Sequence, residues 1–238
     1  MTENMEFPIR INRYLELLGV ATRKGADHLI EAGLVLINKR RAILGQKINQ
    51  DDQVEVLSAK IKLPSAELVY LAFYKPRGLV THSPRAGERG IDLAKKYPGI
   101  FPLGRLDKDS EGLILMTNDG RVTERLLHPR FQHEKEYLIT VRENIVPVMK
   151  KTLETGVNSQ GQKLTAKTVE IIDKHTLNII LTSGQKHQIR RMLAGAHLTV
   201  ESLKRIRIMD ITLGRLKPGQ SRFLLSKEKA DFLKALGL

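Results

Sequence analysis

The segment Phe101–Gly120, FPLGRLDKDSEGLILMTNDG, constrains the fold most, because a charged turn stands directly before a short apolar run. Gly104 and Gly112 let the backbone turn tightly on either side of Asp107. The run Leu113–Met116 is typical of a short buried strand. An aspartate in a glycine-rich turn is most often a turn former. A charged acid beside the core is costly to place, however, so Asp107 is also a candidate catalytic residue.

Residues beyond 68 contain more strand patterns than helix patterns. We expect strands at Val69–Tyr74, Tyr137–Val141 and Leu177–Thr182. Apolar residues three and four positions apart predict a helix at Gln185–Ala196, and a last helix is expected at 226–236. Because the helices do not alternate regularly with the strands, the pattern favours an α+β fold with a mixed, largely antiparallel sheet over a doubly wound parallel sheet.

The first 60 residues follow a different order of elements. Two short helices are expected, at Ile11–Leu18 and from the N-cap residue Thr22 to Gly33. Strands are expected at Leu34–Ile37 and Gln53–Leu57. The turn after the first of these strands has a lysine where glycine is usual, at a position that favours positive φ.

A polar segment separates these two patterns. Residues 61–68 include Pro64 and Ser65 and lack strong periodicity, which predicts a linker. The expected organisation is therefore a small domain of two helices and short strands at 1–60, the linker at 61–68 and a larger domain at 69–238.

Charge points to a polyanionic partner. The chain has 40 Lys and Arg against 26 Asp and Glu, a formal net charge of +14, which favours nucleic acid. Residues 184–222 carry nine of these cations against two acids. The absence of cysteine excludes disulfides, thiolate zinc sites and thiol nucleophiles. No apolar run is long enough for a membrane span and the N-terminus does not resemble a secretory signal, so we expect a cytoplasmic protein that binds no membrane.

The N-terminal pattern resembles the RNA-binding module named after ribosomal protein S-four, also called the alpha-L motif. The matching residues are RINRYLELLGVATRKGADHLIEAGLVLIN and INQDDQVEV. The resemblance implies an RNA-binding face formed by the second helix and nearby basic residues. The candidates are Arg10, Arg13, Arg23, Lys24, Lys39, Arg40 and Arg41. The alternative is that these charges only solvate the helix surfaces.

Four later motifs occur in a fixed order: KPRG at Lys75–Gly78, GRLDKDSEGL around Asp107, HEKEYLITV with Tyr137, and SGQKHQIRRML with Arg190 and Arg191. Together they resemble the ribosomal RNA pseudouridine synthases of the group that comprises RsuA, RluB, RluE and RluF. The runs GRLDKDSEGL and LKRIRIMDITL look closest to the RluF branch. The resemblance implies isomerisation of a uridine in RNA to pseudouridine, without a metal or an organic cofactor.

The same resemblance implies roles for the catalytic residues. The Asp107 carboxylate would attack C1′ or C6 of the nucleotide, or accept a proton from C2′, and the sequence does not decide among these steps. Arg190 would be the counter-ion of Asp107, although a phosphate contact on a basic helix would also explain it. Tyr137 would stack on the uracil, although a core tyrosine at a strand start is an equal alternative.

Further residues are expected to contact the RNA or shape the pocket. Arg105 would occupy the space left by a base taken out of its stack, or touch its phosphate. Lys75 and Gly78 would form the pocket floor. Phosphate contacts are expected from Arg191, Lys204, Arg205 and Arg207. Because few aromatic residues lie between the linker and Asp107, shape and backbone contacts should matter more than broad base stacking.

Two other functions fit part of the sequence. A non-catalytic RNA-binding ribosome-assembly factor would explain the charge and the N-terminal module without Asp107. A metal-dependent nuclease would use Asp107, Asp109 and Asp119 as clustered ligands. Our first expectation is a monomeric enzyme acting on 23S ribosomal RNA of the large ribosomal subunit, free or within a pre-ribosomal particle. Ribosomal RNA of the small subunit or transfer RNA would be the alternative substrates.

Overall fold

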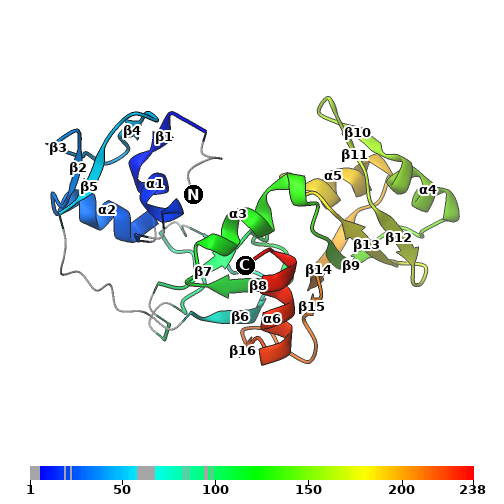
Figure 1. Cartoon of the computed structure of the whole chain (residues 1–238). Coiled ribbons are helices and arrows are strands. Elements are labelled where there is room, and N and C mark those ends of the chain that lie inside the picture. The colour runs from blue at the N-terminus through cyan, green and yellow to red at the C-terminus, as the bar shows by residue number, and fades with distance from the viewer. Residues whose placement is uncertain are drawn as a thin grey trace. The chain divides into compact units, whose positions relative to one another are not determined.

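The computed structural model describes residues 6–18, 20–21, 23–57, 68–82, 84, 86–93, 96–97 and 99–238. The chain folds into two compact units (Figure 1). One comprises Met1–Glu67 with Asp119–Arg121, and the other comprises Leu68–Asn118 with Val122–Leu238. The predicted N-cap Thr22 and all of the predicted linker except Leu68 lie outside the described residues.

The N-terminal unit contains two helices and five short strands in its described part. In chain order these are β1 (Ile9–Arg10), α1 (Ile11–Leu17), α2 (Arg23–Glu31), β2 (Val35–Ile37), β3 (Arg40–Arg41), β4 (Lys47–Ile48) and β5 (Val54–Val56). Strands β3, β2 and β5 form an antiparallel sheet, and β1 pairs with β4. Ile11, Ala26 and Ile48 are fully buried in its core. The β2–β3 turn has Asn38 and Lys39 at φ 49° and 66°, which confirms the expected positive φ at the lysine.

The second unit carries the remaining elements. Its first half contains β6 (Tyr70–Lys75), β7 (Phe101–Leu103), β8 (Glu111–Thr117), α3 (Arg121–Leu127), the 3-10 helix η1 (Pro129–Phe131), β9 (Lys135–Val141) and α4 (Pro147–Thr155). Its second half contains β10 (Val157–Ser159), β11 (Gln162–Leu164), β12 (Thr168–Ile171), β13 (Thr176–Leu181), α5 (Gln188–Gly195), β14 (Val200–Ile208), β15 (Ile211–Thr212), β16 (Ser221–Phe223) and α6 (Ser226–Ala235).

A nine-stranded sheet organises this unit. Its main path runs β12-β13-β9-β14-β8-β6-β16, with β15 paired to β14 and β7 paired to β8. The β14–β8 pair is parallel, and the other pairs are antiparallel. The fold is therefore α+β with a mixed, largely antiparallel sheet, which confirms the prediction. The loop that carries Asp107 leads into β8, so it lies beside the parallel junction.

The centre of the sheet is covered on both faces. Strand β6 is buried throughout, with Leu71 and Phe73 in one apolar cluster and Tyr70 and Ala72 in another. Such runs without alternation are expected for strands that are packed on both faces. Helices α3 and α6 pack on one side of β6 and β8, and α4 and α5 contribute to the other cluster. The core therefore gives the Asp107 loop a rigid base.

Helix α5 begins later than the sequence predicts. It starts at Gln188, because His187 adopts a left-handed conformation with φ 51° and ends the preceding loop. The Gln188 side chain accepts hydrogen bonds from the Gln185 N–H at 2.9 Å and the Ser183 hydroxyl at 3.0 Å. The glutamine thus holds this loop, and its path directs His187 to the site described below. In the part of the chain that the structure describes, no helix is long and apolar enough to cross a membrane.

Candidate active site

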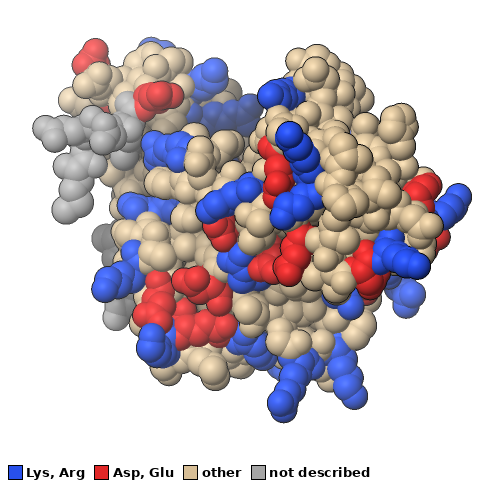
Figure 2. All heavy atoms as spheres, turned by 90° about the vertical axis from the view of Figure 1, so that its right-hand side faces the viewer, with Lys and Arg blue, Asp and Glu red and all other residues tan. Residues whose placement is uncertain are grey.

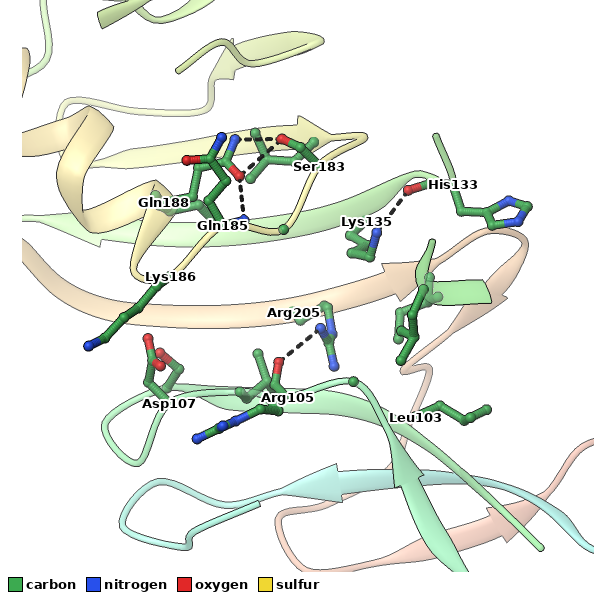
Figure 3. Close-up of a pocket in the computed structure, with 18 of the residues that line it drawn as sticks. Leu103, Arg105, Asp107, His133, Lys135, Ser183, Gln185, Lys186, Gln188 and Arg205 are labelled. Carbon is green, nitrogen blue, oxygen red and sulfur yellow. Dashed lines mark hydrogen bonds between the residues drawn. The ribbon is translucent and has the colours of Figure 1, made fainter. Parts of the chain in front are cut away.

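A cavity of about 940 Å³ brings several of the predicted residues together. It opens between the β7–β8 loop, the α3–β9 connection, the β13–α5 loop and β14, as Figure 3 shows for part of its lining. Asp107, Tyr137, Arg190, Arg105 and Arg205 all line this cavity. They come from four separate parts of the chain, so the sheet topology assembles the site.

Asp107 stands on the β7–β8 loop with its side chain 46% exposed. The loop turns tightly, since the Ser110 N–H donates to the Asp107 carbonyl at 3.0 Å. Lys108, the adjacent cation in the sequence, pairs with Glu88 at 3.0 Å and not with Asp107. The Asp107 carboxylate therefore faces the cavity and is accessible to a ligand.

The partner of Asp107 differs from the expected one. His187 Nε2 lies 3.5 Å from Asp107 Oδ1, whereas the Arg190 guanidinium donates to the backbone carbonyl of Asp109 at 3.4 Å. Within the described residues, Arg190 forms no ion pair with Asp107, so its role as counter-ion stays a prediction. His187 was not singled out from the sequence. The signal for it was its place in SGQKHQIRRM, three residues before Arg190.

Lys75 has a different role from the one expected. It is fully buried, and its ammonium group donates to the carbonyls of Ser110 at 2.7 Å, Pro76 at 3.1 Å and Lys108 at 3.4 Å. Gly78, at φ +85°, donates its N–H to the Lys108 carbonyl at 2.8 Å. Neither residue lines the cavity. The prediction that they form the pocket floor is therefore corrected, because the Lys75 ammonium is bound to backbone carbonyls of the Asp107 loop and its neighbours.

Arg205 supports the same loop from the other side. Its side chain is 4% exposed, donating through Nε to the Leu113 carbonyl at 2.7 Å and through Nη1 to the Arg105 carbonyl at 3.5 Å. A guanidinium buried in this way does not track a phosphate backbone on the surface. The expected phosphate contact is corrected to a structural role at the cavity wall. Arg105 itself is exposed and lines the cavity. This position suits a residue that would occupy the space left by a flipped base.

Three more residues that were predicted to contact phosphate interact with other groups of the protein. Arg191 donates to the Ser159 carbonyl at 2.7 Å and to its hydroxyl at 3.1 Å. Arg207 pairs with Glu134 and Glu136, and Lys204 lies 3.9 Å from Glu111. Lys and Arg are interspersed with Asp and Glu on the face shown in Figure 2. The basic count of residues 184–222 therefore overstates the charge that is free to bind RNA.

For the remaining predicted residues, both the functional and the structural interpretation stay open. Tyr137 is 7% exposed and belongs to the core of β9, yet it also lines the cavity. In the N-terminal unit, Arg13 and Arg23 pair with Glu16 at 2.7 and 3.1 Å. The other basic candidates there are exposed: Arg10, Lys24, Lys39, Arg40 and Arg41. Their contact with RNA stays a prediction.

The nuclease hypothesis requires a carboxylate cluster. Among the described residues, no group of three or more His, Asp or Glu side chains is placed to hold a metal ion. Asp107, Asp109 and Asp119 therefore do not form the two-metal site that this hypothesis needs.

Burial lowers the pKa of Lys75 from 10.5 to about 8, against the opposing effect of the Asp107, Asp109 and Glu111 carboxylates. Between these values the unfolded chain holds a proton that the folded protein has released, so the cost of burying this group falls as the pH rises. We expect the unfolding free energy of the wild type to rise relative to that of Lys75→Met above about pH 8, by at most about 1.4 kcal/mol per pH unit. Urea unfolding of both proteins between about pH 8 and 10.5 measures the difference, in which the contributions of the other titrating groups cancel. A difference independent of pH would contradict the prediction.

Comparisons with known proteins agree with this geometry. A family model described as RNA pseudouridylate synthase matches residues 69–195. The chain is 36% identical to the dual-specificity RNA pseudouridine synthase RluF of Escherichia coli (strain K12), over 96% of this chain and 79% of that protein. It is 35% identical to an uncharacterized RNA pseudouridine synthase of Aquifex aeolicus (strain VF5), over 97% of this chain and 96% of the other. A crystal structure of a pseudouridylate synthase superposes with a TM-score of 0.68 at 27% identity, over 95% of this chain and 99% of that one.

Proposed function

The chain belongs to the RNA pseudouridine synthase family, and we propose that it isomerises one specific uridine of ribosomal RNA, in the large subunit, with Asp107 as the catalytic carboxylate. The observation that carries the assignment of Asp107 is its position. It is the carboxylate of a loop that Lys75 and Arg205 support from behind, and its accessible side chain faces the cavity. Preorganised groups of this kind reduce the cost of reaching a reactive geometry.

The reaction changes connectivity without changing composition. The bond between C1′ and N1 breaks, the uracil turns within the site, C5 joins C1′, and the C5 proton moves to N1 through the site or solvent. No electrons are gained or lost, and no water is consumed. The cavity would hold the uridine after it leaves its stack, with the Tyr137 ring at its wall. Asp107 would engage the sugar or the base, with the His187 imidazole beside its carboxylate and the positive charge of Arg190 nearby.

The domain assignment is part of the same proposal. Residues 1–60 would form an RNA-binding domain, 61–68 a linker and 69–238 the catalytic domain. The exposed cations Arg10, Lys24 and Arg40 support an RNA-facing surface on the first domain. The enzyme would act as a monomer in the cytoplasm, on ribosomal RNA that is free or partly assembled.

Loss of one pseudouridine is the expected result of deleting the gene. Carbodiimide-blocked primer extension on total RNA should show one stop in wild-type cells that is missing in the deletion strain, at a uridine of large-subunit RNA. Purified protein should restore this stop on RNA from the deletion strain, and EDTA should not prevent it.

The same map separates the alternatives. An unchanged pattern after deletion would favour the assembly-factor function and would refute the proposed reaction. A lost stop in small-subunit or transfer RNA would keep the reaction and correct the substrate.

A further inference from the structure

A run of planar side chains lies on the connection between α3 and β9. The Arg130 guanidinium carbon is 4.6 Å from the centroid of the Phe131 ring. The His133 imidazole stacks on the same ring, with centroids 5.8 Å apart and planes 15° from parallel. His128 meets Phe131 edge-on at 6.3 Å. We call Arg130, Phe131 and His133 the planar stack.

The planar stack is exposed and held in place by its backbone. Phe131 is 38% exposed, as is Leu127 four residues before it. His128 accepts a hydrogen bond from the Arg130 N–H at 3.2 Å, and His133 Nε2 lies 2.9 Å from the Arg125 carbonyl, so this nitrogen is the donor. These contacts fix the segment and leave Phe131 partly exposed. A preformed aromatic surface of this type loses little entropy when a planar ligand binds.

His133 brings the planar stack to one end of the cavity that contains Asp107, whereas Arg130 and Phe131 lie outside the lining. His128, Pro129 and His133 line this cavity, and Figure 3 shows His133 and Asp107 at opposite ends of the drawn residues. At about 940 Å³, the volume is near the top of the range of roughly 300 to 1,000 Å³ for sites that enclose a drug-sized molecule. One uridine at Asp107 would therefore leave the His133 end available to another group.

The charge of this end favours a nucleotide. The Lys135 ammonium lies 3.1 Å from the His133 carbonyl, and burial together with the nearby Arg205 lowers the pKa of Lys135. Among the described residues, Asp107 is the one carboxylate that lines the cavity, and it stands at the opposite end from His133, so no acid of the lining lies at the Lys135 end. An RNA strand would bring both a phosphate for Lys135 and a base for the rings.

We propose that the planar stack binds a base of the RNA next to the isomerised uridine, with the intervening phosphate facing Lys135. This subsite rests on the proposed function, because it places both nucleotides on one RNA strand. Bases stack on aromatic side chains and on guanidinium planes in many single-stranded RNA complexes. The surface is local, which is consistent with the small number of aromatic residues elsewhere in the chain.

Phe131→Ala tests the subsite, with Phe223→Ala as the matched control. Neither phenylalanine lines the cavity, but Phe131 lies between the lining residues Pro129 and His133, whereas the exposed Phe223 packs edge-on against Tyr97. Phe131→Ala should bind the fluorescein-labelled RNA AAUAAUAAUAAU roughly tenfold more weakly, within the effect of losing one base–aromatic stack. Phe131→Tyr, which keeps the ring, should bind like the wild type. Fluorescence anisotropy gives each Kd, and thermal melting checks that the variants are folded.

Salt dependence separates stacking from charge. Phe131→Ala should leave the slope of log Kd against log salt unchanged, whereas Lys135→Met should reduce it by about 0.7, the value for one phosphate of a single strand. Equal affinity of Phe131→Ala and Phe223→Ala would overturn the proposal, as would a reduced slope in Phe131→Ala. Pseudouridine formation by the wild type on RNA from the deletion strain is measured in parallel. Its failure would refute the proposed function, while the affinities would still decide whether the stack binds a base.

Discussion

Asp107→Asn should form no detectable pseudouridine, with a loss of at least roughly 10²- to 10⁴-fold in single-turnover rate. The substitution keeps the size and shape of the side chain and removes the charge that would attack the nucleotide or accept its proton. The fold should be unaffected, because the carboxylate is 46% exposed. Its contact with His187 joins two partly exposed side chains, and contacts of this kind contribute at most about 1 kcal/mol. Affinity for RNA should also be retained.

Asp109→Asn is the matched control for this experiment. Asp109 is exposed on the same loop and undergoes the same chemical change, while its carbonyl, which accepts from Arg190, is kept. Both variants are assayed on total RNA from the deletion strain, with circular dichroism and RNA affinity as checks of folding and binding. Turnover in Asp107→Asn, or an equal loss in both variants, would remove Asp107 from its catalytic role.

Gly112→Ala should destabilise the second unit by about 3 kcal/mol or more. A Cβ atom at this position would lie 2.3 Å from the Arg205 carbonyl oxygen and 2.7 Å from its nitrogen, and the glycine has φ +108°. The neighbouring backbone has little freedom to move, because Arg205 pairs with Gly112 in the parallel register. The Arg205 side chain also donates to the Leu113 carbonyl, so both strands would have to separate.

Gly219→Ala separates the steric effect from backbone strain. Gly219 also has positive φ, +83°, but a Cβ atom there would meet nothing within 4 Å. This variant should lose about 1 kcal/mol, the cost of the left-handed conformation alone. Urea unfolding measures both differences against the wild type. Similar losses in the two variants would show that β14 does not approach Gly112 as closely as the structure describes.

Local patterns predicted much of the fold. The burial of Tyr137, Ile139 and Val141 on one side of β9 follows from their alternation, and the last helix begins at the expected Ser226. The start of α5 could not be predicted in this way. The apolar spacing starts only at Ile189 and does not fix the first residue of the helix, whereas the hydrogen bonds of the Gln188 side chain and the left-handed His187 delay its start to Gln188.

The chain order of four motifs was enough to bring Asp107, Tyr137 and Arg190 into one hypothesis, and all three line one cavity. The partners of the charged groups were decided only by tertiary structure. Arg205 meets the Leu113 carbonyl across 92 residues, and Lys75 meets the Ser110 carbonyl across 35. A sequence shows how many cations a segment has, whereas strand pairing determines which of them are buried against carbonyl groups and which remain free. This is because hydrogen-bond partners and desolvation depend on distance in space and not on separation along the chain.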